Sequence, residues 1–118
     1  MDTDSVRFAA GRNIAVKVPA ALHERTVAFY RDTVGLPVVA EEAATVGFEF
    51  GSMTLWIDRV EHATHAEVWL ELSTADVEAG ARRLTDAGAR VADEIEPLGD
   101  APWHWVIDPG GTVLLLTT

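Results

Sequence analysis

The strongest constraint in this sequence is that one short pattern occurs twice. GLPVVAEE at 35–42 matches GARVADEI at 88–95, and GSMTLWI at 51–57 matches GGTVLLL at 110–116. Self-similarity of this kind predicts two copies of one structural unit. A chain of 118 residues is too short for two independent hydrophobic cores. We therefore predict a single domain, 1–118, with unit one at about 13–60 and unit two at about 67–118.

Hydrophobic periodicity assigns the same order of elements to each copy. In each, an alternating strand is followed by a helix and three short strands. We expect Gly35 and Gly88 to end the two helices, and Ser73 or Thr74 to cap the second one. The first copy has its strands at 13–18, 37–42, 46–50 and 53–60 and its helix at 20–34; the second has strands at 67–72, 90–96, 102–108 and 112–118 and a helix at 74–88.

Charge and composition exclude several kinds of partner. The chain carries 19 acidic and 9 basic side chains, a formal net charge of -10, which repels phosphate backbones and anionic lipid. We therefore expect no nucleic-acid and no membrane partner. There is no cysteine to form a disulfide or a thiolate ligand. The N-terminus MDTDSVRF lacks the basic start of a targeting segment, so we expect a cytoplasmic protein.

The chain ends in DPGGTVLLLTT, a turn at 108–111 followed by an apolar strand. This turn, after a repeated strand–helix–three-strand unit, resembles the vicinal oxygen chelate superfamily, which includes glyoxalase I, extradiol dioxygenases and bleomycin-resistance proteins. The resemblance implies an α+β fold in which two βαβββ units form a curved mixed sheet, or half-barrel, with the helices outside. It also implies an open cavity and a homodimer.

The resemblance also implies where a divalent metal ion would be bound, because the family's enzymes commonly use one residue from the first and last strand of each unit. Carried over to this chain, these positions fall on Asn13, Glu67, Trp56 and Leu115. A tryptophan and a leucine offer no donor atom to a metal ion. One carboxylate with one amide does not compensate for the hydration that the ion would lose. We therefore expect no metal and no other cofactor.

Strand alternation predicts which side chains would face the cavity instead. If Ile14, Val16, Val18, Val68, Leu70 and Leu72 pack against the helices, the intervening residues face the hollow. Trp103 and Trp105 are expected to share one face of their strand and to serve in packing. The predicted ligand-binding residues are Asn13, Lys17, Trp56, Asp58, Glu67, Trp69, Glu71 and Leu115.

An aromatic and acidic wall suits a flat organic molecule, and a cationic one in particular. The first hypothesis is accordingly a metal-independent binding protein that sequesters such a compound, like the bleomycin-resistance proteins, with antibiotic resistance as a role. An alternative is a lyase or isomerase in which Glu67 or Glu71, beside apolar neighbours such as Trp69 and Leu115, is the general base. A third is an interaction module whose cavity has collapsed. His62 and His65 are three residues apart without a helix to hold them, and are expected to be solvated or locally hydrogen-bonded.

Overall fold

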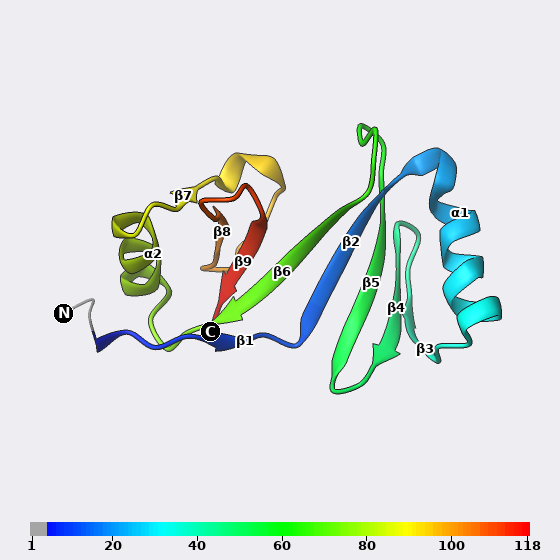
Figure 1. The fold of residues 1–118 in the computed structure, drawn as a ribbon, viewed down its shortest axis with the longest axis horizontal. Helices are drawn as coiled ribbons and strands as arrows, with labels where there is room; N and C mark the ends of the chain where they lie inside the picture. The colour runs from blue at the N-terminus through cyan, green and yellow to red at the C-terminus, as the bar shows by residue number, and fades with distance from the viewer. Residues whose placement is uncertain (1–4) are drawn as a thin grey trace. The chain divides into compact units, whose positions relative to one another are not determined.

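The computed structural model describes residues 5–118, and it has the mixed α+β fold that the sequence predicts (Figure 1). Within the described part, neither α-helix has the length and apolarity to cross a membrane. The elements in chain order are β1 (Ala9–Ala10), β2 (Asn13–Pro19), α1 (Ala20–Ala28), the π-helix η2 (Phe29–Val34), β3 (Val38–Glu41), β4 (Thr45–Phe50), β5 (Met53–Val60), β6 (Glu67–Ser73), α2 (Val77–Asp86), β7 (Arg90–Val91), the 3-10 helix η3 (Asp93–Ile95), β8 (His104–Ile107) and β9 (Val113–Thr117).

The chain divides into two compact units. The first unit is 12–69, and the second unit comprises 70–118 with the N-terminal segment up to residue 11. The division falls within β6, whose first three residues belong to the first unit and whose last four belong to the second. Each unit contains the predicted order of one strand, one helix and three strands, so two βαβββ units are present.

In the first unit the strands pair in the order β3-β4-β5-β2, with the start of β6 next to β2. The β2–β5 pair is parallel, while β6 runs antiparallel to β2. Figure 1 shows α1 alongside these strands. Because apolar residues alternate along β2, β4 and β5, one face of the sheet packs under the helix as a core of Val18, Val27, Val46, Phe48, Leu55 and Ile57, joined by Ile14, Val16, Tyr30 and Leu36.

The first helix changes geometry before it ends. Its α-helical part stops at Ala28, and Phe29–Val34 continues as a π-helix. Gly35 then ends the segment in the left-handed conformation, with φ 81°, and its N–H donates to the carbonyl of Tyr30 at 3.0 Å. The predicted terminal glycine is therefore confirmed, and its lack of a Cβ makes this backbone conformation inexpensive.

In the second unit β9 lies between β6 and β8, parallel to the first and antiparallel to the second, and β7 pairs with β8. The short β1 pairs with the end of β6. Val77 and Ala81 of α2 pack on Val106 and Leu116 as the core of this unit. The DPGG turn precedes β9, and the Asp108 carboxylate fixes it by accepting from the N–H groups of Gly110 and Thr112, each at 2.9 Å.

Three predictions about the second unit were wrong. Neither Ser73 nor Thr74 caps α2; Asp76 does, with its carboxylate accepting from Ala79 N–H at 3.0 Å. The strand expected at 90–96 ends at Val91, because the Asp93 carboxylate accepts from the backbone N–H of Trp105 at 2.8 Å and the chain turns into η3.

Trp103 and Trp105 do not share a face. Trp103 precedes β8 and packs against the α2 core, so the alternation of β8 does not extend to it. Trp105 lies opposite Leu115 on the other face of the sheet, and its indole N–H donates to the carbonyl of Glu96 at 2.9 Å.

Two residues expected under the helices are also exposed instead. The exposed fractions are 51% for Val68 and 41% for Leu70. Within the first unit, α1 packs mainly over β5 and β2 and leaves Val68 uncovered. Only Leu72 of this alternating set of β6 contacts a helix-side core.

Candidate functional site: the indole face of the first unit

The candidate site is the face of the first unit's sheet opposite α1, called here the indole face. Strand pairing places Ala15 opposite Trp56 on one side and opposite Trp69 on the other. Because pairing residues point to the same side of a sheet, the two indoles flank Ala15. The indole face comprises Asn13, Ala15, Lys17, Thr45, Gly47, Trp56, Asp58, Glu67 and Trp69.

Trp56 lies across the sheet between two strands. Its indole N–H donates to the side-chain oxygen of Asn13 at 2.7 Å, so Asn13 on β2 fixes one edge of the ring. The other edge passes over Gly47 on β4, where a Cβ on residue 47 would lie only 2.9 Å from the ring. A residue with a side chain at 47 would push the ring away, so this glycine is required by close approach rather than by its backbone conformation.

Lys17 forms the second fixed group of the indole face. Its side chain is buried, with 6% of the residue exposed, and its Nζ lies 2.8 Å from the Asp58 carboxylate. The same Nζ lies 4.2 Å from the ring centre of Trp69, in a cation–π contact. The Thr45 hydroxyl donates a short hydrogen bond to the other oxygen of Asp58. Each charge in this cluster is thus compensated.

Glu67 lies at the margin of this cluster. It pairs with Lys17 in the β2–β6 register, its side chain is 50% exposed, and Trp69 Nε1 donates to it at 3.4 Å. Since Lys17 is four residues from Asn13, Glu67 is separated from Asn13 by about 13 Å along the strands. The two positions that the metal carry-over assigned to the strand starts are therefore not neighbours.

The donor set does not fit a divalent metal ion. Asn13 already accepts from Trp56, the indole has no acceptor to offer, and Glu67 lies apart from both. Within residues 5–118, no three histidine or carboxylate side chains gather in a way that could hold an ion. We therefore derive no step of function through a metal.

Two of the predicted ligand-binding residues belong to the second unit. Glu71 and Leu115 are partners in the β6–β9 register and share a face there with Trp105. The Glu71 carboxylate lies over Gly11, so closely that a Cβ on residue 11 would overlap it. The prediction that these residues bind a ligand stays a prediction.

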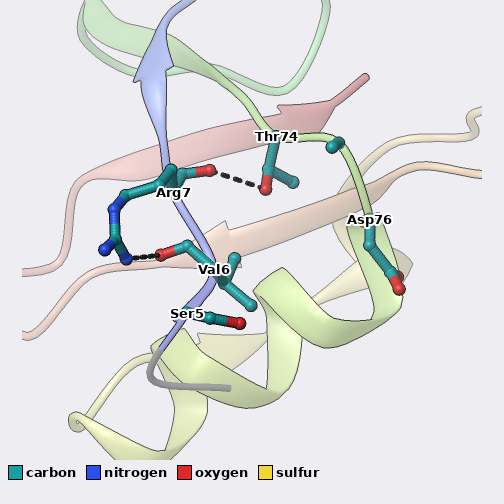
Figure 2. Close-up of a pocket in the computed structure, with 6 residues that line it drawn as sticks. Ser5, Val6, Arg7, Thr74 and Asp76 are labelled. Carbon is teal, nitrogen blue, oxygen red and sulfur yellow. Dashed lines mark hydrogen bonds between the residues drawn. The ribbon is translucent and has the colours of Figure 1, made fainter. Parts of the chain in front are cut away.

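A pocket that sequence reasoning did not find lies in the second unit (Figure 2). It has a volume of about 250 Å³ and is lined by Ser5, Val6, Arg7, Thr74, Ala75 and Asp76. Two of its polar groups serve the fold, since Thr74 donates to the carbonyl of Arg7 at 2.8 Å and Asp76 caps α2. It contains none of the predicted ligand-binding residues.

His104 is a further residue whose environment the sequence did not reveal. Its Nδ1 lies 2.6 Å from Asp93 and its Nε2 lies 2.7 Å from Glu78. Burial lowers the pKa of His104, but the hydrogen bonds and charges of Asp93 and Glu78 outweigh it, and the net pKa is raised above the ordinary 6.5. A protonated ring donates from both nitrogens, which suits a bridge between two carboxylates.

Comparison with known proteins identifies the family. A glyoxalase-like domain model matches residues 13–117, nearly the whole chain. The chain belongs to the glyoxalase-like domain family. This confirms the resemblance to the vicinal oxygen chelate superfamily that the repeat and the DPGG turn predicted. The search of curated proteins found no match for this glyoxalase-like chain.

Solved structures of the superfamily share the fold at low identity. A Mn(II)-bound glyoxalase from Novosphingobium aromaticivorans is 21% identical, with a TM-score of 0.68 over 95% of this chain and 40% of its own. Methylmalonyl-CoA epimerase from Mycobacterium tuberculosis is 17% identical, with a TM-score of 0.62 over 91% and 85%. Homoprotocatechuate 2,3-dioxygenase from Brevibacterium fuscum is 19% identical, with a TM-score of 0.63 over 94% and 36%.

The glyoxalase-like chain thus spans less than half of the length of that glyoxalase and of that dioxygenase. At these identities the likeness shows the fold, and the site has to be argued from this chain's own residues.

Proposed function

We propose that this glyoxalase-like protein binds a flat aromatic compound on the indole face, without a metal ion, and that the compound is sequestered rather than converted. The observation that carries the proposal is the placement of Trp56 and Trp69 on either side of Ala15. Two strand spacings separate the indole-bearing positions by about 10 Å. We expect the small side chain of Ala15 to leave room for a ring above the middle strand.

The charges of the indole face favour a neutral or cationic compound over an anionic one. Lys17 is neutralised by Asp58 and already occupies a face of the Trp69 ring. Glu67, half-exposed beside Trp69, adds a negative charge at the margin. We expect Trp56 to be the main stacking surface, because no cation of the described chain is found over its ring.

Fluorescence quenching tests this proposal. The probes are three flat dyes of similar size, a cationic acridinium, a neutral polycyclic compound and a sulfonated anionic one, and the expected order of affinity is cationic, neutral, anionic. Trp56→Ala is expected to weaken binding of the acridinium about 2- to 30-fold, the equivalent of a cation–π contact. Trp103→Phe is the matched control, since Trp103 packs in the second unit. Equal affinity of Trp56→Ala and the parent protein would refute the proposal.

Metal independence has a separate test. We expect calorimetric titration with manganese, zinc, nickel or iron(II) to give no stoichiometric heat, because the donor set at Asn13, Trp56 and Glu67 does not fit an ion. Stoichiometric uptake of any of these ions, reversed by a chelator, would end the metal-independent interpretation.

The second candidate function is an isomerase or lyase with a carboxylate base, and the fold shared with methylmalonyl-CoA epimerase favours it. Glu67 or Glu71 would be the base. Against it, Glu67 is half-exposed and lacks the enclosure that catalytic carboxylates usually have. We expect no exchange of deuterium into methylmalonyl-CoA incubated with the protein in D₂O; exchange that disappears in Glu67→Gln or Glu71→Gln would establish catalysis instead.

The net charge bears on the partners and the cellular location of the protein. In keeping with the net charge of -10, we propose a small molecule as the partner, with no nucleic acid and no membrane, in a cytoplasmic homodimer. Sedimentation equilibrium measures the oligomeric state, and a monomer at all concentrations would contradict the dimer.

A further inference from the structure

A second pocket in the first unit lies on the helix side of the sheet, away from the indole face. It has a volume of about 370 Å³, within the range of small-molecule sites. Its walls come from α1 and η2, from β3 and β4 with the turn between them, and from the end of β5. The lining residues include His23, Glu24, Arg31, Glu41, Glu42 and Arg59, over an apolar floor that contains Val27 and Val46.

His23 is a buried polar group with one nitrogen unused. The residue is only 8% exposed, and its Nε2 lies 2.9 Å from the carbonyl oxygen of Ile57. A carbonyl oxygen only accepts, so Nε2 carries the hydrogen and Nδ1 of the neutral ring is an acceptor. Nδ1 has no hydrogen-bond partner among residues 5–118, and no fully buried polar side-chain atom of that range is unsatisfied, so Nδ1 is not fully buried. His23 lines the pocket, which is therefore a space available to Nδ1.

Within the described chain, the arginines at the pocket form ion pairs, whereas two of its glutamates do not. Both arginines have carboxylate partners outside the pocket lining: Arg31 with Asp32 at 2.9 Å and Arg59 with Glu61 at 3.2 Å. Glu24 and Glu42 have no ion-pair partner within residues 5–118. The two guanidinium charges are offset by carboxylates outside the lining, so the three glutamates of the lining give the pocket an excess of negative charge beside the imidazole acceptor.

We propose that this pocket binds a small organic amine in its ammonium form, with the N–H groups donating to His23 Nδ1 and to the carboxylates and the alkyl part resting on Val27 and Val46. An ammonium group suits acceptors that stand apart, because N–H···O bonds extend to about 3.2 Å. A divalent ion needs its donors together at about 2.0 to 2.6 Å, and no such group of three occurs among the described residues.

Titration by NMR tests the proposal on the intact protein. The probe is n-butylammonium chloride, and n-butanol and sodium butyrate are the neutral and anionic controls at matched ionic strength. We expect the amine alone to shift the backbone amides of His23, Glu42 and Ala43 and the ring ¹⁵N signal of His23 Nδ1. Absence of these shifts, or equal shifts with butyrate, overturns the proposal.

Variants separate specific binding from general attraction to an acidic protein. Glu42→Gln is an exposed change that leaves the core intact, and we expect it to weaken butylammonium binding about threefold to tenfold. Asp100→Asn removes the same charge from an exposed position in the second unit and is expected to leave binding unchanged. Equal weakening in both variants overturns the proposal.

The result is independent of the proposed function of the indole face. Trp56 does not line this pocket, so Trp56→Ala is expected to keep the amine-dependent shifts of His23. Loss of those shifts in Trp56→Ala, with the fold intact, would contradict two separate sites.

Discussion

The ammonium nitrogen of Lys17 is 2.8 Å from the carboxylate of Asp58 and 4.2 Å from the ring centre of Trp69. A ligand is therefore not needed to fill the cationic position beside Trp69. The sequence predicted that an indole on this face would attract a cation, and the chain itself provides one.

Removing the partner of Lys17 is expected to destabilise the protein. Asp58→Asn leaves a buried ammonium group without its counter-charge, which costs about 1 to 4 kcal/mol of unfolding free energy. Lys17→Met is expected to cost less, because the Asp58 side chain is 21% exposed and retains the Thr45 hydroxyl. Urea denaturation measures both, and a larger loss in Lys17→Met would contradict the assignment.

A side chain at position 47 is expected to displace Trp56. Gly47→Ala places a Cβ about 2.9 Å from the ring, and the strain costs about 1 to 3 kcal/mol of unfolding free energy. The tryptophan emission spectrum should change as the indole loses its bond to Asn13. In the Trp56→Leu background the same substitution should cost less, because the indole contact is gone and the Thr54 methyl, 3.1 Å from that Cβ, remains. An equal cost in both backgrounds would rule out the contact.

The bridge at His104 predicts a pH dependence. Because the folded pKa is raised above 6.5, the bridge stabilises the fold fully below the unfolded pKa, and this stabilisation is lost as pH rises through the folded pKa. The difference in unfolding free energy between the parent and His104→Gln should therefore shrink from mildly acidic to alkaline pH. Denaturation curves across this range measure it, and a difference that grows with pH would contradict the assigned sign.

The cap of α2 gives a fourth prediction. Asp76→Ala removes the acceptor of the Ala79 N–H and should cost about 0.5 to 2 kcal/mol of unfolding free energy. The sequence suggested Ser73 as one of two possible caps. Ser73→Ala should reduce the unfolding free energy less than Asp76→Ala does, because Ser73 does not cap the helix. Thermal denaturation of the two variants distinguishes them, and the reverse order would restore the original assignment.

The order of elements could be predicted because it follows from local periods and from the repeat. The alternation of β2 and β5 correctly placed Asn13, Lys17, Trp56 and Asp58 on one face, since neighbouring side chains of a strand point to opposite sides. Gly35 was predictable for a similar reason, because a helix end requires a left-handed residue there.

The features that the sequence did not predict depend on contacts between residues distant in the chain. Alternation alone could not show that α1 does not cover Val68, or that Lys17 folds onto Trp69. Asp93 ends a strand because of Trp105, twelve residues away, and the environment of His104 depends on two carboxylates from separate elements. The pocket at His23 involves α1, η2 and three strands, and no spacing along the chain reveals it.

The bare backbone at Gly47 couples two positions of the first unit. Glutamate in place of Trp56 would leave unfilled volume over that glycine, while a side chain at 47 would meet the indole wherever Trp56 is retained. The two positions are therefore expected to covary among related sequences, because a change at either one alone gives a protein that is less stable than this one.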